Sequence, residues 1–127
     1  MTVQLDDRAC QVLSTRTRFP EIARELRDIL GATLVAYIGS VSETRAVRQW
    51  ASGERTPSNV VENRLRLAYR AAKCIAEIDG REIAQAWFQG LNPMLADVSP
   101  ARFLRERDIN VDGKAFIAAE KYFIANG

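Results

Sequence analysis

The longest helical pattern in the chain spans residues 58–79, and it constrains the fold more than any other segment. Apolar residues recur there at three- and four-residue spacing, at Val61, Leu65, Ala68, Ala72, Ile75 and Ile78. A second set, Leu67, Tyr69, Ala71, Cys74 and Ala76, extends the apolar surface over more than half of the circumference. Ser58 or Asn59 can cap the start of this helix, and Gly80 follows its end. We therefore expect a helix with several neighbours, which joins two halves of the molecule or supplies a dimer face.

The rest of the chain has the same helical spacing, and no segment of useful length alternates apolar and polar residues as a strand does. Shorter helices are expected over residues 5–14, 20–30, 33–38, 43–50, 81–89 and 101–107, and from residue 112 onward. Ser99 and Pro100 form a cap and first-turn pair, whereas residues 110–113 should interrupt the chain before Asp112 caps the last helix. The sequence predicts an all-α bundle of about seven or eight helices.

A tight turn is expected at residues 39–43. Gly39 can adopt the left-handed conformation that ends a helix. Ser40 and Glu43 have the spacing of a capping box, and Ser42 is an alternative cap for the next helix. Gly53 and Pro57 should close that helix. Because only about four residues separate it from the short helix at residues 33–38, the pair has the geometry of a helix-turn-helix.

The helix expected over residues 43–50 has two different faces. Ala46, Val47 and Trp50 form an apolar face, and we expect Trp50 to pack against the preceding helix and the long helix. The polar residues that could reach base edges and phosphates are Ser42, Thr44, Arg45, Arg48, Gln49 and, beyond the helix, Arg55. An amphipathic surface helix without any partner has the same two faces. The short helix just before it favours contact with double-stranded DNA.

The positive charge is unevenly distributed, although the net charge is only +2. Residues 40–76 hold seven basic and three acidic side chains, residues 1–39 hold five of each, and residues 77–127 hold six basic and eight acidic. The excess coincides with the expected DNA-contacting helix and the helix after it, as in a module that neutralises phosphates. Arg64, Arg66 and Arg70 could equally solvate an exposed face.

Cysteine and histidine usage limits the chemistry of the chain. Cys10 and Cys74 are far apart and lie among apolar residues, so we expect buried free thiols. The chain has no histidine, which removes the commonest zinc ligand and general base. We predict no catalytic residues, no metal site and no cofactor, which makes a small enzyme the weakest of three functional hypotheses. No membrane span or signal peptide is expected, so the sequence predicts a cytoplasmic protein.

The spacing W-x-x-x-x-N-P-x-L-x-x-x-x-P occurs once, within residues 84–104. The residues that carry it, with two flanking matches, are Ala84, Trp87, Asn92, Pro93, Leu95, Pro100 and Leu104. This segment resembles the C-terminal signature of the Xre/MbcA/ParS-type antitoxins, and the turn-helix unit with Trp50, Gly53 and Pro57 is similar to their Xre-like N-terminal half. Asp97 stands where that family often has glycine, and residues 108–113 match it poorly.

The resemblance implies a type II toxin-antitoxin system. An antitoxin of this kind represses its own promoter through its N-terminal half and neutralises a RES-domain, NAD-degrading toxin through its C-terminal half. The division it suggests is residues 1–57 for DNA binding, residues 58–79 as the connecting helix, and residues 80–127 for toxin binding or dimerisation. The alternative is a stand-alone transcriptional or phage-type repressor without a toxin. Either protein is expected to be a homodimer.

The final helix is the expected partner surface. It carries more large apolar side chains than a terminal helix usually needs, and they cannot all face the same way. We expect Trp87 and Leu104 to be core residues, so that contact with the partner falls to Tyr122, Phe123, Asn126 and Gly127.

Overall fold

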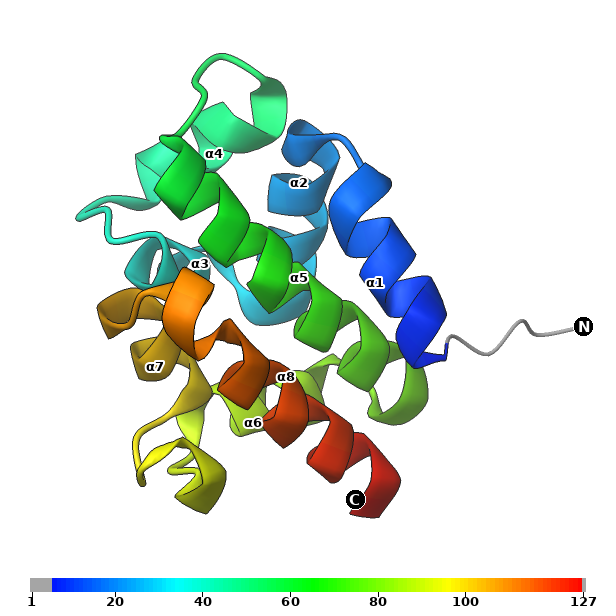
Figure 1. The fold of residues 1–127 in the computed structure, drawn as a ribbon. Coiled ribbons are helices and arrows are strands. Elements are labelled where there is room, and N and C mark those ends of the chain that lie inside the picture. Colours follow the sequence, from blue (N-terminus) through cyan, green and yellow to red (C-terminus); the bar gives the residue numbers. More distant parts are fainter. Residues whose placement is uncertain (1–5, 127) are drawn as a thin grey trace, which may run out of the picture.

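The computed structural model describes residues 6–126, and that part of the chain is all-α, as predicted. Figure 1 shows its helices: α1 (Asp7–Arg16), α2 (Phe19–Leu30), α3 (Ala32–Ile38), α4 (Thr44–Ser52), α5 (Asn59–Asp79), α6 (Arg81–Gln89), the short 3-10 helix η1 (Pro93–Leu95), α7 (Pro100–Glu106) and α8 (Ile109–Asn126). The only β-type pairing in the described residues is an isolated bridge between Asn92 and Val98.

Helix α5 runs through the middle of the molecule, between α1–α4 and α6–α8 (Figure 1). The Ser58 side chain caps its start by accepting a hydrogen bond from the backbone N–H of Val61. It contacts α1, α2, α3, α6, α7 and α8. The broad apolar surface of this sequence is therefore covered by neighbours within one chain, as the helical spacing predicts.

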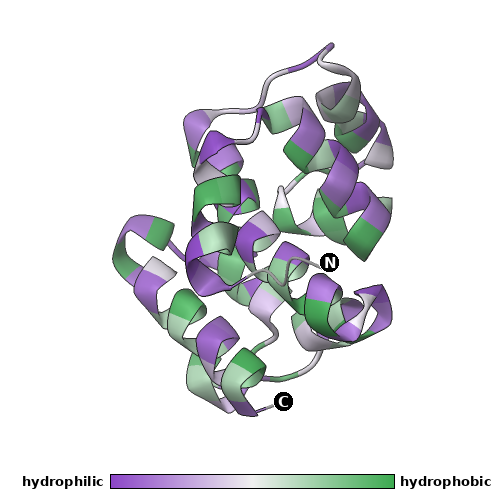
Figure 2. Cartoon of the chain, turned by 90° about the vertical axis from the view of Figure 1, so that its right-hand side faces the viewer, coloured by the Kyte–Doolittle hydropathy of each residue, from purple (hydrophilic) through white to green (hydrophobic). Residues whose placement is uncertain are grey.

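One hydrophobic core extends through both halves. Phe19 and Trp50 meet edge to face on the α2–α4 side, and Trp87, Phe88 and Phe116 form an aromatic cluster between α6 and α8. Figure 2 shows hydrophobic and hydrophilic stretches alternating along the helices, the pattern of amphipathic helices that each bury one side. The expected core role of Trp87 is confirmed, because only 8% of its surface is exposed.

The turn between α3 and α4 differs from the sequence prediction. Ser40, not Gly39, has the left-handed backbone, with φ 58°. The N–H groups of Ser40 and Val41 donate to the carbonyls of Tyr37 and Ala36, which is a Schellman ending. Gly39 is in the right-handed region, and a Cβ on it would lie 2.8 Å from Cη2 of Trp50. Glycine is needed here for the close approach of the indole ring.

The capping box predicted for the next helix is also absent. Helix α4 begins at Thr44, its N-cap residue is Glu43, and no side chain caps it. Ser40 cannot cap α4 because it still belongs to the ending of α3. At the other end of α4, Gly53 is left-handed, with φ 81°, as the sequence predicts for a helix-closing glycine.

The break predicted at residues 110–113 is wrong. Helix α8 begins at Ile109 and runs through Gly113, and the Asp108 carboxylate accepts a hydrogen bond from the N–H of Asn110. Gly113 is buried, and a Cβ on it would lie 3.7 Å from Leu67 of α5. Packing of α8 on α5 therefore keeps this segment helical despite its weak local helix propensity.

The prediction of free thiols is wrong as well. Cys10 of α1 and Cys74 of α5 form a disulfide, with their Cα atoms 6.0 Å apart. Because they are 64 positions apart in the sequence, only the packing of α1 against α5 brings them together.

Candidate nucleic-acid interface

Helix α4 is held by its apolar face, and the residues predicted to bury it do so. Ala46, Val47 and Trp50 are all buried, with Trp50 only 1% exposed. The indole ring lies against Phe19 of α2, with ring centroids 6.2 Å apart, and against Gly39 at the end of α3. The predicted packing of Trp50 on the preceding helix is thus confirmed, whereas the other described contact of its ring is with α2 and not with the long helix. These contacts fix the rotation of α4 about its own axis.

The opposite face of α4 is open to solvent. Thr44, Arg45 and Arg48 are exposed and Gln49 is half-buried, whereas Ser42 and Arg55 are exposed on the flanking loops. The packing thus leaves the polar side chains that the sequence singles out pointing away from the core. Polar side chains in such positions can form hydrogen bonds and ion pairs with a binding partner.

Four of the six predicted DNA-contacting residues line one concavity of about 500 Å³. These are Ser42, Arg45, Gln49 and Arg55. Ser40, Val41, Glu43 and Ala46 complete its lining. The concavity is polar because the α3–α4 turn and the loop after α4 present hydroxyl, carboxylate and guanidinium groups to it. The sequence indicates Ser40 only as a helix cap and not as a site residue, whereas in the structure it lines this concavity.

Arg48 and Thr44 lie outside this concavity. The guanidinium of Arg48 is 3.8 Å from the Glu54 carboxylate, and both side chains are more than half exposed. A pair this long and this exposed is weak. Arg48 can therefore exchange Glu54 for a phosphate at little cost in free energy.

Two further arginines, which the sequence does not connect to the turn, hold it in place. Arg64 of α5 donates from Nη1 to the Ile38 carbonyl and to the Ser40 hydroxyl, each at 3.2 Å. Arg105 of α7 donates to the Tyr37 carbonyl at 2.7 Å and lies over the Tyr37 ring. Burial, and then the neighbouring Arg105, lowers the pKa of Arg64. Arg64 thus satisfies the Ile38 carbonyl, which the end of α3 leaves without a helical partner, and Arg105 adds a second donor to the Tyr37 carbonyl.

Other basic residues of the positive segment have partners inside the molecule. Arg66 pairs with Glu62 and donates to the carbonyls of Ser14 and Thr17. Arg70 is buried against Asp7, and Lys73 pairs with Glu25 on α2. The local positive excess in the sequence therefore overstates the charge available to phosphates. Arg45, Arg48 and Arg55 are the exposed arginines around α4.

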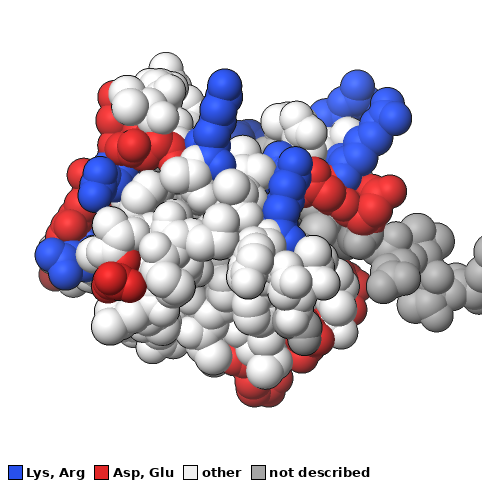
Figure 3. Space-filling model, turned by 60° about the horizontal axis from the view of Figure 1, so that its bottom comes forward, with Lys and Arg blue, Asp and Glu red and all other residues white. Residues whose placement is uncertain are grey.

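The predicted partner surface on α8 divides into exposed and packed residues. Tyr122 is 59% exposed, and Asn126 is exposed and donates to the Tyr122 carbonyl. Phe123 is half-buried, with its ring centroid 6.2 Å from that of Trp87, so it is partly a core residue. Gly127 lies outside the described residues. Figure 3, seen from the lower side of Figure 1, shows a broad area without charged side chains.

The residues of the C-terminal signature have mostly structural roles. Ala84, Trp87, Leu95, Pro100 and Leu104 are buried. The Asn92 side chain accepts a hydrogen bond from the N–H of Met94 and starts η1, and the Ser99 hydroxyl caps α7 as predicted. Asp97 is left-handed, with φ 61°, which explains why glycine suits that position. The signature therefore builds the α6–α7 connection, while Leu91 and Met94 within it are exposed.

In residues 6–126, no group of three or more histidine, cysteine or acidic side chains is placed to hold a metal ion. None of the described helices has the length and hydropathy to cross a membrane. No family model, no curated protein and no solved structure matches this chain.

Proposed function

We propose that this chain binds double-stranded DNA by placing the exposed face of α4 in the major groove. The observation that carries the proposal is the division of α4 into two faces. Ala46, Val47 and Trp50 are buried, while Thr44, Arg45 and Arg48 are exposed. A helix that inserts into the major groove needs this combination, because base edges are read by polar side chains on a rigidly held helix. In this proposal Arg45 and Gln49 contact bases, while Ser42, Thr44, Arg48 and Arg55 contact phosphates or the edge of the groove.

The ordered turn before α4 supports the same proposal. Arg64 and Arg105 fix the end of α3 from two other helices. A rigid turn keeps α4 in one orientation, so that less conformational entropy is lost on binding. One such unit per chain with three exposed arginines binds weakly alone, and we therefore propose a homodimer on half-sites ~34 Å apart. Light scattering of the protein–DNA complex measures this stoichiometry.

We propose further that the chain is a repressor of its own promoter and the antitoxin of a RES-type toxin. The support is the resemblance of residues 84–104 to the antitoxin signature, together with the exposed Tyr122 on α8. The stand-alone repressor is the second candidate, and the packing roles of Trp87, Leu95 and Leu104 favour it, since those residues need no partner to explain them. In both candidates the chain is cytoplasmic and has no cofactor.

The test of DNA binding is titration of a labelled promoter fragment with Arg45→Ala and Arg48→Ala variants at several salt concentrations. Loss of a bidentate base contact costs ~1–3 kcal/mol for the specific site only, so Arg45→Ala should reduce the preference for the promoter over unrelated DNA. Loss of a phosphate contact weakens binding to all sequences and lowers the salt dependence by about one ion, as expected for Arg48→Ala.

Arg102→Ala is the matched control. Arg102 is an exposed arginine on α7 that pairs with Glu106, much as Arg48 pairs with Glu54. It should leave both affinity and salt dependence unchanged. The proposal is wrong if Arg45→Ala and Arg48→Ala bind the promoter as the unsubstituted protein does.

A further inference from the structure

Helix α1 is attached to the molecule in a different way from the other helices. Its buried residues are Cys10 and Ser14, and the hydrophobic core cluster contains no residue of α1. Of its other apolar side chains, Leu13 packs partly against the core and Val12 is 40% exposed. Little apolar surface is therefore exposed when α1 leaves α5, and the hydrophobic effect holds it weakly.

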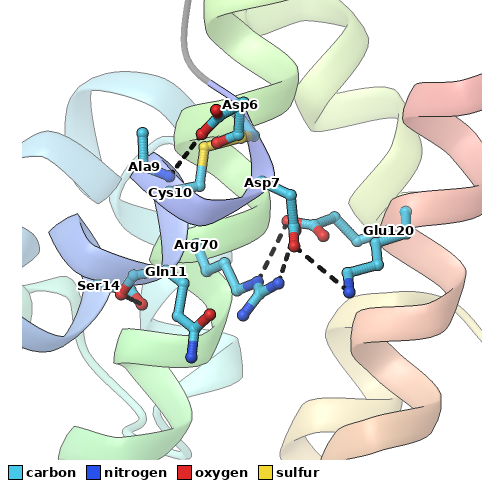
Figure 4. Close-up of polar contacts among 10 residues, drawn as sticks. Asp6, Asp7, Ala9, Cys10, Gln11, Ser14, Arg70 and Glu120 are labelled. Atoms are coloured by element: carbon cyan, nitrogen blue, oxygen red, sulfur yellow. Dashed lines mark hydrogen bonds and ion pairs between the residues drawn. A yellow bond between two sulfur atoms is a disulfide. The ribbon is translucent and has the colours of Figure 1, made fainter.

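Polar contacts hold both ends of α1 instead. At its start, the Asp7 carboxylate is 2.6 Å from Nη2 of Arg70 on α5 and 3.3 Å from Nζ of Lys121 on α8. At its end, Arg66 of α5 donates to the carbonyls of Ser14 and Thr17. Figure 4 shows Asp7 and Arg70 facing each other beside the disulfide. Water can replace each of these contacts when the helix lifts, because the groups are charged or polar.

The surface beneath α1 contains buried charged groups that contact with water would stabilise. Glu120 of α8 is completely buried, and neither of its carboxylate oxygens has a hydrogen-bond partner among the described residues. Its nearest cation is Arg70, with Nε 3.8 Å from Oε1, and that Nε is itself buried without a partner. Opening of α1 would let water reach both groups, which offsets part of the free energy lost with the Asp7 contact.

The covalent bond is what opposes this opening. Cys10 and Cys74 are both buried, and their bond joins the middle of α1 to α5. We propose that this disulfide is a redox latch: a dithiol reductant releases it, and α1 then detaches from α5 while α2–α8 stay folded. The proposal does not depend on DNA binding, because α1 packs mainly against α5.

The chemistry is thiol–disulfide exchange. A thiolate of the dithiol attacks one sulfur of the pair, the Cys10–Cys74 bond breaks, and a mixed disulfide forms. The second thiol of the reductant then displaces the remaining cysteine, so that the protein gains two electrons and two protons and the reductant becomes a disulfide. A low-molecular-weight disulfide reverses the reaction. Since both sulfurs are buried, the first attack requires a partial, transient opening of α1 while the bond is still intact, and this local opening limits the rate. Full detachment of α1 follows only after the bond is broken.

Hydrogen exchange of the full chain tests the latch. Protein with the disulfide formed and protein reduced with dithiothreitol are compared at the same pH. In the reduced protein, amides of residues 7–16 should exchange at least about tenfold faster, while those of α2–α8 change less than about twofold. The double variant Cys10→Ser with Cys74→Ser, measured without reductant, should exchange like the reduced protein. The double variant Cys10→Ala with Cys74→Ala repeats this comparison without introducing buried hydroxyl groups.

The rate of reduction tests the gating by α1. With rising dithiothreitol, the rate should reach a plateau set by opening, and Asp7→Asn should raise that plateau several-fold because it removes the contact with Arg70 and Lys121. Asp28→Asn, at an exposed position on α2, should not change it. The proposal is overturned if α1 is equally protected from hydrogen exchange in both redox states, or if all helices lose protection together on reduction. It is also overturned if protein prepared without reductant contains two free thiols.

Discussion

At the scale of single residues, the contact between Gly39 and Trp50 decides how α4 is seated. A Cβ at Gly39 would lie 2.8 Å from Cη2 and 3.1 Å from Cζ3 of Trp50, which is far inside van der Waals contact. The backbone of Gly39 is right-handed and would itself accept alanine. Any cost of Gly39→Ala therefore reports the ring contact and not the backbone conformation.

We expect Gly39→Ala to lower the free energy of unfolding by about 1–3 kcal/mol, the usual cost of overpacking. Chemical denaturation measures it. The smaller ring of Trp50→Phe should relieve part of that cost, so the two substitutions together should cost less than the sum of their separate costs. Strict additivity would mean that the indole ring does not determine the residue at position 39.

Glu120 makes the stability of the protein depend on pH near neutrality. Burial raises the pKa of Glu120 to about 7; Arg70 opposes this change, and Asp7 adds to it. The folded protein therefore holds this proton more tightly than the unfolded chain, whose glutamate has its ordinary pKa of 4.5. The stabilisation is complete below pH 4.5 and is lost as the pH rises toward 7, by up to ~1.4 kcal/mol per pH unit.

Glu120→Gln replaces the carboxyl group with a neutral amide of the same shape. The difference in unfolding free energy between this variant and the unsubstituted protein should therefore change between pH 5 and pH 7, with the unsubstituted protein losing stability as the pH rises. Urea titrations across that range measure the difference. A constant difference from pH 5 to pH 8 would show that Glu120 does not titrate there.

At the scale of elements, α8 shows how packing can override local sequence signals. Gly113 lies in the first half of this helix with ordinary helical backbone, and a Cβ there meets Leu67 at 3.7 Å, a normal packing distance. Gly113→Ala should therefore raise the free energy of unfolding by about 0.5–1 kcal/mol, because alanine has the higher helix propensity. Thermal or urea unfolding measures this change.

Gly53→Ala is the contrasting variant. Gly53 is left-handed, with φ 81°, and the nearest atom to a Cβ there is 4.0 Å away, so its substitution should destabilise through the backbone alone. For Gly113→Ala, the contradicting outcome is a loss of stability. It would support the interruption of the helix that the sequence predicts at residues 110–113.

At the scale of the whole molecule, α5 links the proposed DNA-binding face to the proposed partner surface. We expect Tyr122→Ala to abolish neutralisation of a co-expressed toxin encoded beside this chain, because exposed aromatic side chains often dominate interface energies. Promoter binding should be unchanged, since α4 lies on the other side of α5 (Figure 1). Growth rescue and promoter titration measure the two effects separately.

Two variants on the same helix act as controls. Lys114→Ala, at an exposed position of α8, should preserve rescue. Phe123→Ala should lower thermal stability as well as rescue, because its ring packs near Trp87. Full rescue by Tyr122→Ala would favour the stand-alone repressor.

Local signals account for the elements that the sequence predicts well. The bounds of α5 follow from the Ser58 cap, Gly80 and apolar spacing, and α4 buries the three residues that its own spacing indicates. Each of these features acts over a few neighbouring residues, so it can be recognised without knowledge of the fold. The exposed polar face of α4, and with it the candidate site, follows from the same spacing.

Most of the features that local signals miss join residues distant along the chain. Cys10 pairs with Cys74, Arg70 with Asp7 and Glu120, and Arg64 reaches the end of α3. The residue at position 39 is likewise decided by the distant Trp50 ring, and Gly113 lies in a helix that packs near Leu67 of α5. Such contacts depend on how helices pack, and the same helical pattern is compatible with many packings. They exist only once α1, α7 and α8 have taken their places around α5.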